Sequence, residues 1–148
     1  MLALPPAPKA PLPRLDDATI RKFVAEQEAA WNARDFEHYY RLCAPDAIFV
    51  SVHWNSDGSI TREQRTLDED RTSAQKFFAN HPDNVVETDT IDSVTLTPDG
   101  LGAHVVGHGT IRFMTKGKPQ VLNAVTDQTV VLRDGHILSL GQTDVSER

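Results

Sequence analysis

Four long strand-like segments separated by tight turns constrain the fold more than any other feature of this chain. They cover residues 85–97, 103–115, 121–132 and 136–145 and are rich in β-branched residues. The sequences "PDG", "KGKP" and "RDG" lie between them and are typical of turns. Strands joined by such short turns run antiparallel. The second half of the chain is therefore predicted to be a meander of long antiparallel strands.

Helical patterns come before this meander. Apolar residues recur at helical spacing as far as Trp31, after a capping aspartate that is either Asp16 or Asp17. Further along, "TLDE" has the form of a capping box made by Thr66 and Glu69. It predicts another helix that ends before the proline at position 82, because proline cannot continue a helix.

A short helix and a strand are predicted between these two helices. In residues 36–43, "FEHYYRLC", aromatic residues and a cysteine lie at helical spacing. Pro45 closes this helix, since the residue before a proline is driven out of the α region. Residues 47–54, "AIFVSVHW", are rich in β-branched and aromatic residues and predict a strand. The expected class is α+β, with three N-terminal helices packed on a curved, mainly antiparallel sheet.

The first residues differ in composition from the remainder. Five of the nine prolines fall within "MLALPPAPKAPLPR". We expect residues 1–15 to be a flexible, proline-rich leader and residues 16–148 to be a single domain with one hydrophobic core. The leader has no continuous apolar region of the kind a secretory signal needs. The protein is expected to be cytoplasmic, or periplasmic if a signal peptide has been removed.

Charge and motifs exclude several classes of function. The formal net charge is −6 and basic residues do not cluster, so neither nucleic acid nor a membrane surface is an expected partner. No apolar run approaches the ~18 residues of a membrane-spanning helix. His104 and His108 are four residues apart on a predicted strand, about 13 Å, which is too far to share one ion. We expect no metal and no cofactor.

The order of the elements, with "NARDFEHYYRLCAPDAIFV" and "RDGHI", resembles the nuclear transport factor 2-like superfamily. This superfamily includes ketosteroid isomerases, SnoaL-like polyketide cyclases, scytalone dehydratase and non-catalytic binding domains. The resemblance covers residues 17 to 145. It implies a cone-shaped barrel with a cavity between the helices and the concave sheet face, and a homodimer formed through the outer sheet face.

Alternation along the strands predicts which side chains face the cavity. The apolar set of residues 103–115 should face inward, which places His104 and His108 outside. In the last strand, Leu138 and Leu140 are expected to face inward. Mostly apolar walls with a few hydrogen-bonding groups are typical of a site for a small apolar or aromatic molecule. The predicted ligand-binding residues are Gln27, Trp31, Tyr40, Ser51, Phe113, Gln128 and Gln142.

The catalytic groups of known members are not found at the positions that the resemblance implies. The roles of the ketosteroid isomerase acids fall on Gln27, Ser51, and Gln128 or Thr126, none of which is an acid, so isomerase chemistry is not expected unless Asp127 faces the cavity. Limonene-epoxide-hydrolase-type members use an acid–arginine–acid constellation to activate water. No inward arginine between inward acids is expected in this chain.

Two functions remain open. The loss of the acids favours a small-molecule-binding domain without catalytic machinery. The alternative is a SnoaL-like or dehydratase-like lyase or isomerase that uses His53 as general base, because an imidazole titrates near neutral pH. In that alternative Asp144 orients His53 and Tyr40 is a proton donor.

Overall fold

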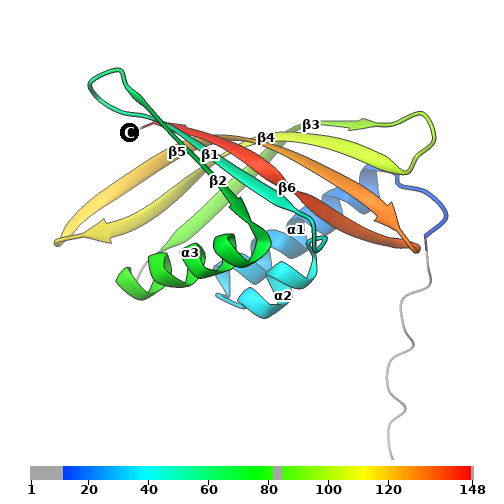
Figure 1. Ribbon diagram of the computed structural model, residues 1–148, viewed down its shortest axis with the longest axis horizontal. Coiled ribbons are helices and arrows are strands. Elements are labelled where there is room, and N and C mark those ends of the chain that lie inside the picture. Colours follow the sequence, from blue (N-terminus) through cyan, green and yellow to red (C-terminus); the bar gives the residue numbers. More distant parts are fainter. Residues whose placement is uncertain (1–11, 82–84, 148) are drawn as a thin grey trace, which may run out of the picture.

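A six-stranded sheet that curves over three helices makes up the described part of the chain (Figure 1). The computed structural model describes residues 12–81 and 85–147. The strand order is β2-β1-β6-β5-β4-β3, and all neighbours are antiparallel except β1 and β6, which are parallel. The elements are α1 (Asp17–Asn32), α2 (Phe36–Arg41), β1 (Ile48–Trp54), β2 (Ile60–Thr66), α3 (Leu67–Asn80), β3 (Val86–Leu96), β4 (Gly102–Thr115), β5 (Lys118–Arg133) and β6 (His136–Glu147).

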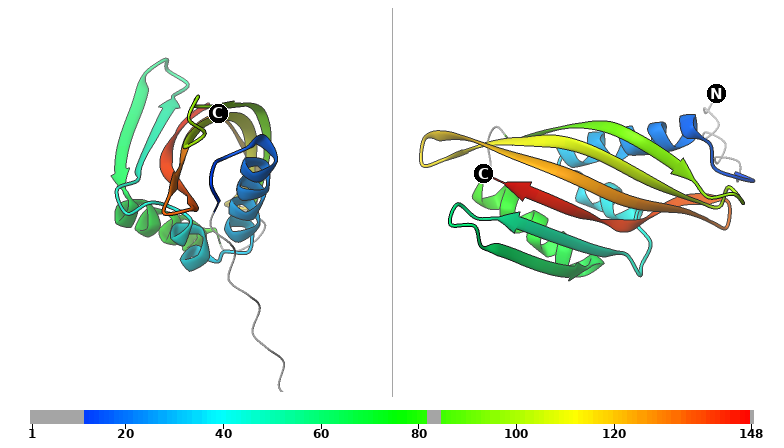
Figure 2. Two further views of the ribbon diagram at one scale, coloured as in Figure 1. Left: turned by 90° about the vertical axis from the view of Figure 1, so that its right-hand side faces the viewer. Right: turned by 90° about the horizontal axis from the view of Figure 1, so that it is seen from above.

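The α+β class and the three helices before the meander are confirmed. The helices lie against the concave face of the curved but unclosed sheet, as two further views show (Figure 2). The Asp16 carboxylate caps α1 by accepting the Thr19 backbone N–H at 2.7 Å. Both hydrogen bonds of the capping box between Thr66 and Glu69 are present at the start of α3. No helix within the described residues is long and apolar enough to cross a membrane.

Strand β2 was not expected from the sequence. Its sequence, "ITREQRT", is polar, and only Arg65 is shielded from solvent to any degree. It pairs with β1 at the edge of the sheet, where charged residues are common because they discourage pairing with other chains. The register places Arg65 opposite Phe49, so Arg65 projects from the concave face.

A β-bulge in β6 changes the predicted alternation of the last strand. Gln128 pairs with Gln142, but Val130 pairs with Ser139, so β6 contains one extra residue at this point. Gly141 has a φ of 99° there, and a Cβ at this position would overlap the backbone of Ile48. Because of the bulge, Leu138 lies opposite the outward residue Val131, and Leu140 falls within the bulge. The prediction that Leu138 faces inward is wrong.

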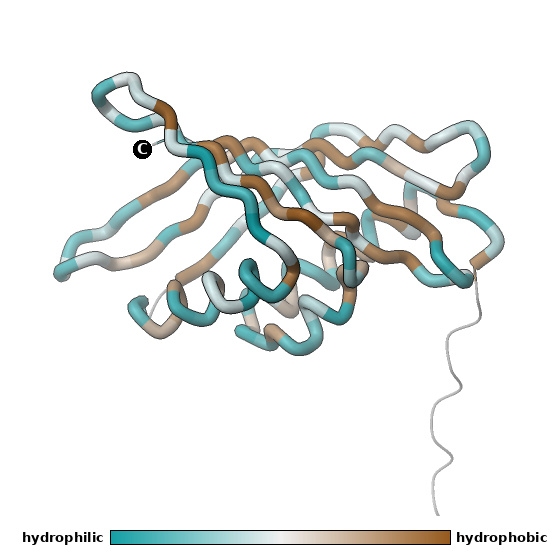
Figure 3. The backbone as a smooth tube through the Cα atoms, in the orientation of Figure 1, coloured by the Kyte–Doolittle hydropathy of each residue, from teal (hydrophilic) through white to brown (hydrophobic). Residues whose placement is uncertain are grey.

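Two groups of buried side chains hold the helices on the sheet. One joins Ile20 and Phe23 of α1 to Ala103, Val105 and Val130 of the sheet. The other surrounds Tyr39, Tyr40 and Phe49, where α2 leads into β1. Apolar stretches follow the long strands, and the hairpin turns are hydrophilic (Figure 3).

The domain begins a few residues before the predicted boundary at residue 16. Leu15 is 3% exposed and belongs to the first group of buried side chains. The backbone N–H groups of Leu12 and Leu15 donate to the carbonyl groups of Gly135 and Gly100, at 2.9 and 2.7 Å. Residues 12–15 therefore pack on the domain, and the remainder of the predicted leader, residues 1–11, lies outside the described residues.

Candidate functional site

An inner cavity of about 270 Å³ lies between the helices and the concave face of the sheet. Aromatic walls come from Trp31 of α1, Tyr39 of α2, Phe49 of β1 and Phe77 of α3. A smaller space of about 60 Å³ adjoins it and shares Tyr39 with it. The polar groups of the inner cavity are more numerous than strand alternation predicts; the main ones are Ser51, Arg65, Asp70, Glu87, Gln142 and Asp144.

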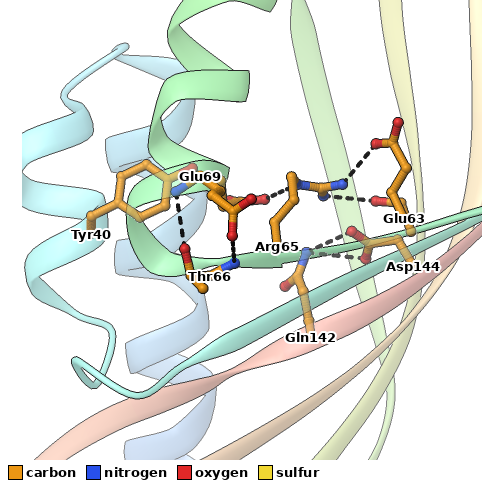
Figure 4. A network of polar contacts seen from close by, with 9 residues as sticks. Tyr40, Glu63, Arg65, Thr66, Glu69, Gln142 and Asp144 are labelled. Carbon is orange, nitrogen blue, oxygen red and sulfur yellow. Dashed lines mark hydrogen bonds and ion pairs between the residues drawn. The ribbon is translucent and has the colours of Figure 1, made fainter.

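Asp144 of β6 is a carboxyl group that lines this cavity. Gln142 donates its side-chain amide to both Asp144 carboxylate oxygens at 3.0 Å (Figure 4). Burial raises the pKa of Asp144 to about 6, although the Gln142 hydrogen bond and the Arg65 charge act in the opposite direction. Near neutral pH this carboxyl group therefore exchanges its proton readily, as a general acid or base must.

Arg65 of β2 and Asp70 of α3 form an ion pair in the same cavity. The Arg65 Nε donates to Asp70 at 2.9 Å, and its Nη2 donates to the Ser51 hydroxyl at 2.8 Å. A third contact, from Nη1 to Glu63, is 3.1 Å long, so Arg65 is held from three sides (Figure 4). The expectation that no arginine lies between inward acids is wrong, because Arg65 belongs to a strand, β2, whose polar sequence has no apolar alternation.

Glu87 and Asp89 of β3 are two further carboxyl groups on the concave side. They share a hydrogen bond in which Glu87 carries the proton, because burial and the charges of Asp89 and Asp144 raise the Glu87 pKa well above its usual range. Asp89 lies opposite Gly109, where a Cβ would overlap its carboxylate. Sequence reasoning missed both residues. The signal was the alternation in "VETDTI", which places them on the same face as Ile91.

Gln27 of α1 and Gln128 of β5, two predicted ligand-binding residues, are bonded to each other. Each amide donates to the carbonyl oxygen of the other, at 2.7 and 3.1 Å, and each residue is 6% exposed. Both line the smaller space beside the inner cavity. The amides thus satisfy much of their hydrogen-bonding capacity without a ligand.

The structure does not bring His53 and Asp144 together as a catalytic pair. Instead, His53 Nδ1 contacts the Ser146 hydroxyl at 2.9 Å, and within the described residues no hydrogen bond joins His53 to Asp144. Tyr40, the expected proton donor, donates to Asp70 at 2.7 Å, and burial raises its pKa, so the hydroxyl stays protonated. It is the neighbouring Tyr39 that lines the cavity.

The remaining predicted ligand-binding residues divide between the cavity wall and its surroundings. Ser51, Gln142 and Trp31 line the inner cavity, and the Trp31 indole N–H is buried with no hydrogen-bond partner among the described residues. Phe113 instead packs its ring on Phe77 and His81, with centroids 5.6 and 5.0 Å apart. No group of three or more potential ligands that could hold a metal ion occurs within the described residues.

The outer face of the sheet carries the residues that alternation placed there. His104 contacts Asp127, which is therefore outside the cavity, and His108 Nδ1 contacts the Asp92 carboxylate at 2.9 Å. Asp127 consequently cannot supply the missing isomerase acid. Val125 and Val145 lie opposite one another on this face and are 53% and 37% exposed.

Comparisons with known proteins reveal similarity in structure alone. No family model and no curated protein matches the sequence. A protein of unknown function from Shewanella oneidensis, described as NTF-2 like, is 18% identical with a TM-score of 0.58, over 88% of this chain and 98% of that one. An uncharacterised Caulobacter vibrioides protein with a cystatin-like fold is 17% identical with a TM-score of 0.64, over 87% of each chain.

The protein has the nuclear transport factor 2-like fold. The same fold similarity extends to the beta subunit of benzoate 1,2-dioxygenase from Burkholderia mallei, which is 11% identical with a TM-score of 0.65, over 89% of this chain and 91% of that one. Proteins of the nuclear transport factor 2-like fold thus include both uncharacterised domains and a subunit of an enzyme. The fold alone does not decide the function, which depends on the residues of the cavity.

Proposed function

We propose that the inner cavity binds a small uncharged molecule and acts on it by general acid–base catalysis, with Asp144 as the base. The observation that carries this proposal is the position of Asp144 in one cavity with the ion pair of Arg65 and Asp70. A base is most effective when its pKa lies near the working pH, and the pKa of Asp144 is raised to about 6.

The other charged groups suit the same chemistry. Arg65 can stabilise negative charge that develops on an oxygen atom, and Asp70 holds the guanidinium in place. Glu87, which carries a proton, is a candidate acid on the opposite wall. The acids around Arg65 resemble the acid–arginine–acid constellation of limonene-epoxide-hydrolase-type proteins. The reaction class proposed is therefore the addition of water to a small electrophile such as an epoxide.

The charge and size of the cavity favour an uncharged substrate. Asp70, Glu87 and Asp144 line it, and Arg65 is the one cation among its lining residues in the described part of the chain. Glu87 carries a proton, but the carboxyl groups of Asp70 and Asp144 still outnumber the single cation Arg65, so the cavity disfavours an anion. A volume of about 270 Å³ and the ring faces of Trp31 and Phe77 suit a small molecule with an aromatic or cyclic apolar part.

A non-catalytic ligand-binding domain is the second candidate. It is favoured by the hydrogen bonds between Gln27 and Gln128, because the positions at which the resemblance implies isomerase acids are occupied by mutually bonded amides. The dehydratase-like alternative with His53 as base has less support, since His53 contacts Ser146 and not Asp144.

We also propose that the protein forms a homodimer through the outer sheet face. The exposed valines Val125 and Val145 support this assembly, because apolar side chains on a sheet face favour burial against a partner. The similarity to a dioxygenase beta subunit, by its name a component of a larger assembly, is consistent with this use of the fold.

Hydrolysis of styrene oxide in ¹⁸O-labelled water tests the catalytic proposal. The unsubstituted protein should form labelled diol, and Asp144→Asn should reduce the rate by roughly 10²–10⁴-fold, the usual contribution of a general base. The His53→Gln variant should retain activity. Equal rates for Asp144→Asn and the unsubstituted protein would contradict the role of Asp144. No turnover of any uncharged epoxide, enone or hydroxyketone would favour the binding domain.

A further inference from the structure

A groove of about 1000 Å³ lies outside the inner cavity, at the end of the molecule where the chain enters α1. Its walls are the first half of α1, the segment after α2 and the turn between β5 and β6. The left view of Figure 2 looks onto this end, with the start of α1 and the β5–β6 turn toward the viewer. The groove is larger than the inner cavity, and none of the carboxyl groups Asp70, Glu87, Asp89 and Asp144 lines it.

The floor of this groove is apolar. Phe23 belongs to the buried group around Ile20, and Leu42 and Ile137 pack against the same group. Leu138, which the β6 bulge turns away from the inner cavity, also lines the groove. Side chains that pack on the core at one side and line a groove at the other offer an apolar surface to a ligand.

Backbone hydrogen bonds hold the walls of the groove in place. The Ala44 N–H donates to the carbonyl of Ser139 at 2.8 Å, and the Ser139 N–H donates to the carbonyl of Leu42 at 2.9 Å. The Leu12 N–H donates to the carbonyl of Gly135 at 2.9 Å. The segment after α2 and the chain before α1 are thus tied to β6 and to its preceding turn, and Phe23 of α1 belongs to the buried group against which Ile137 packs. A ligand therefore need not order these walls when it binds.

Within residues 12–81 and 85–147, the groove is lined by three cationic side chains, Lys22, Arg41 and Arg133, and by two acidic ones, Glu26 and Asp134. Arg133 is paired with Asp46 at 2.7 Å. Lys22 extends from α1 and Arg41 from α2, and among the described residues neither makes an ion pair with a carboxylate. Of the acids in the groove, Glu26 is engaged by His38 at 2.9 Å. A chain with a formal net charge of −6 thus presents two cations without a carboxylate partner in the part that the structure describes, Lys22 from α1 and Arg41 from α2, beside an apolar floor.

We propose that this groove is a second binding site, for a single-chain amphiphile with a carboxylate head group, such as a free fatty acid. The apolar chain lies on Phe23, Leu42 and Ile137, and the carboxylate contacts Lys22 and Arg41. A neutral alcohol of the same length leaves both cations without a partner, and a cationic amphiphile is repelled by them. This inference does not depend on the function proposed for the inner cavity.

Calorimetric titration of the full chain with laurate, below its critical micelle concentration, tests the proposal. We expect one laurate to bind per chain, more tightly than dodecanol, with no binding of dodecyltrimethylammonium. The double variant Lys22→Glu/Arg41→Glu should weaken laurate binding roughly tenfold, about threefold for each exposed charge pair. Circular dichroism should confirm that the variant is folded.

Two controls locate the binding site. Lys76→Glu/Lys118→Glu changes the net charge equally at exposed positions outside the groove and should leave laurate binding unchanged. Asp144→Asn alters the inner cavity and should also leave it unchanged. The proposal is overturned if laurate does not bind, if both double variants weaken it equally, or if only Asp144→Asn changes it. Cosedimentation with phosphatidylglycerol vesicles, reversed by Lys22→Glu/Arg41→Glu, would overturn it in favour of a membrane surface.

Discussion

The side chains of Gln27 and Gln128 donate hydrogen bonds to each other, at 2.7 and 3.1 Å, and thereby join α1 to β5 in the interior. A buried amide without a hydrogen-bond partner has a desolvation cost that nothing offsets. The pair therefore stabilises the packing of α1 on the sheet, and its two members act as a unit.

Substitution of this pair should be strongly non-additive. Gln27→Met or Gln128→Met alone should reduce the free energy of unfolding by about 1–3 kcal/mol, because each leaves one buried amide unpaired. The double variant should cost less than the sum of the two single changes, since no amide then remains. Urea denaturation of all four proteins measures the coupling. Additive losses would mean that the two amides do not depend on each other.

The Asp144→Asn variant should change stability in a pH-dependent manner. The pKa of Asp144 is raised to about 6 in the folded protein, so the folded state binds its proton more tightly than the unfolded state does. Its contribution to stability is therefore largest below about pH 4 and is lost as pH rises through about 6. As the pH rises from 4 to 7.5, the free energy of unfolding of Asp144→Asn should increase by about 2 kcal/mol relative to that of the unsubstituted protein.

Chemical denaturation of the two proteins across this pH range checks that result. Asp68→Asn is a suitable control, because it makes the same chemical change at a side chain that is 89% exposed and lies outside the inner cavity. A constant difference between Asp144→Asn and the unsubstituted protein at every pH would contradict a raised pKa at Asp144. A carboxyl group that destabilises the fold at neutral pH is also easier to explain by function than by structure.

Arg65→Gln should raise the pKa of Asp144. The positive charge of Arg65 favours the ionised form of Asp144, so its removal leaves burial less opposed. Titration of the Asp144 side-chain carbon by ¹³C NMR measures the change directly. As a control, Arg62→Gln removes an exposed arginine from the outer side of the same strand. An unchanged or lowered pKa in Arg65→Gln would show that the two groups are not coupled.

The interior sites were predictable in part from strand alternation. On β4 and β5 the pattern correctly separates the inward Val105 and Gln128 from the outward His104 and Asp127. Helix caps were equally well determined, because the Thr66 capping box depends on residues close in sequence. Local residue spacing thus predicts the inward and outward faces of a strand and the cap of a helix.

Asp144 is among the residues that the sequence suggests for catalysis, but the groups around it could not be predicted as easily. Arg65 belongs to a polar edge strand whose sequence has no apolar alternation, so nothing local distinguishes it from a loop. Leu138 faces outward because of the bulge in β6. A single glycine in the sequence is not enough to predict that bulge. The contact between His53 and Ser146 depends on the pairing of β1 with β6, two strands far apart in the sequence.

The outer sheet face should hold two copies of the chain together. Val125→Asp should convert the dimer to a monomer, because a carboxylate at a residue 53% exposed in the single chain would be buried unpaired at the interface. Light scattering after gel filtration measures the mass. Leu101→Asp, at a residue 47% exposed in the turn before β4, should leave the mass unchanged. A monomeric mass for the unsubstituted protein would refute the dimer.

The crystal structure of the protein soaked with 1-phenylethane-1,2-diol, the hydration product of styrene oxide, tests the central proposal most directly. The ring should lie against Trp31 and Phe77, and one hydroxyl should lie within about 3 Å of both Asp144 and Arg65. The proposal would be contradicted if electron density for the diol occurred only outside the inner cavity. It would also be contradicted if Trp31 closed the cavity and Asp144 contacted only Gln142.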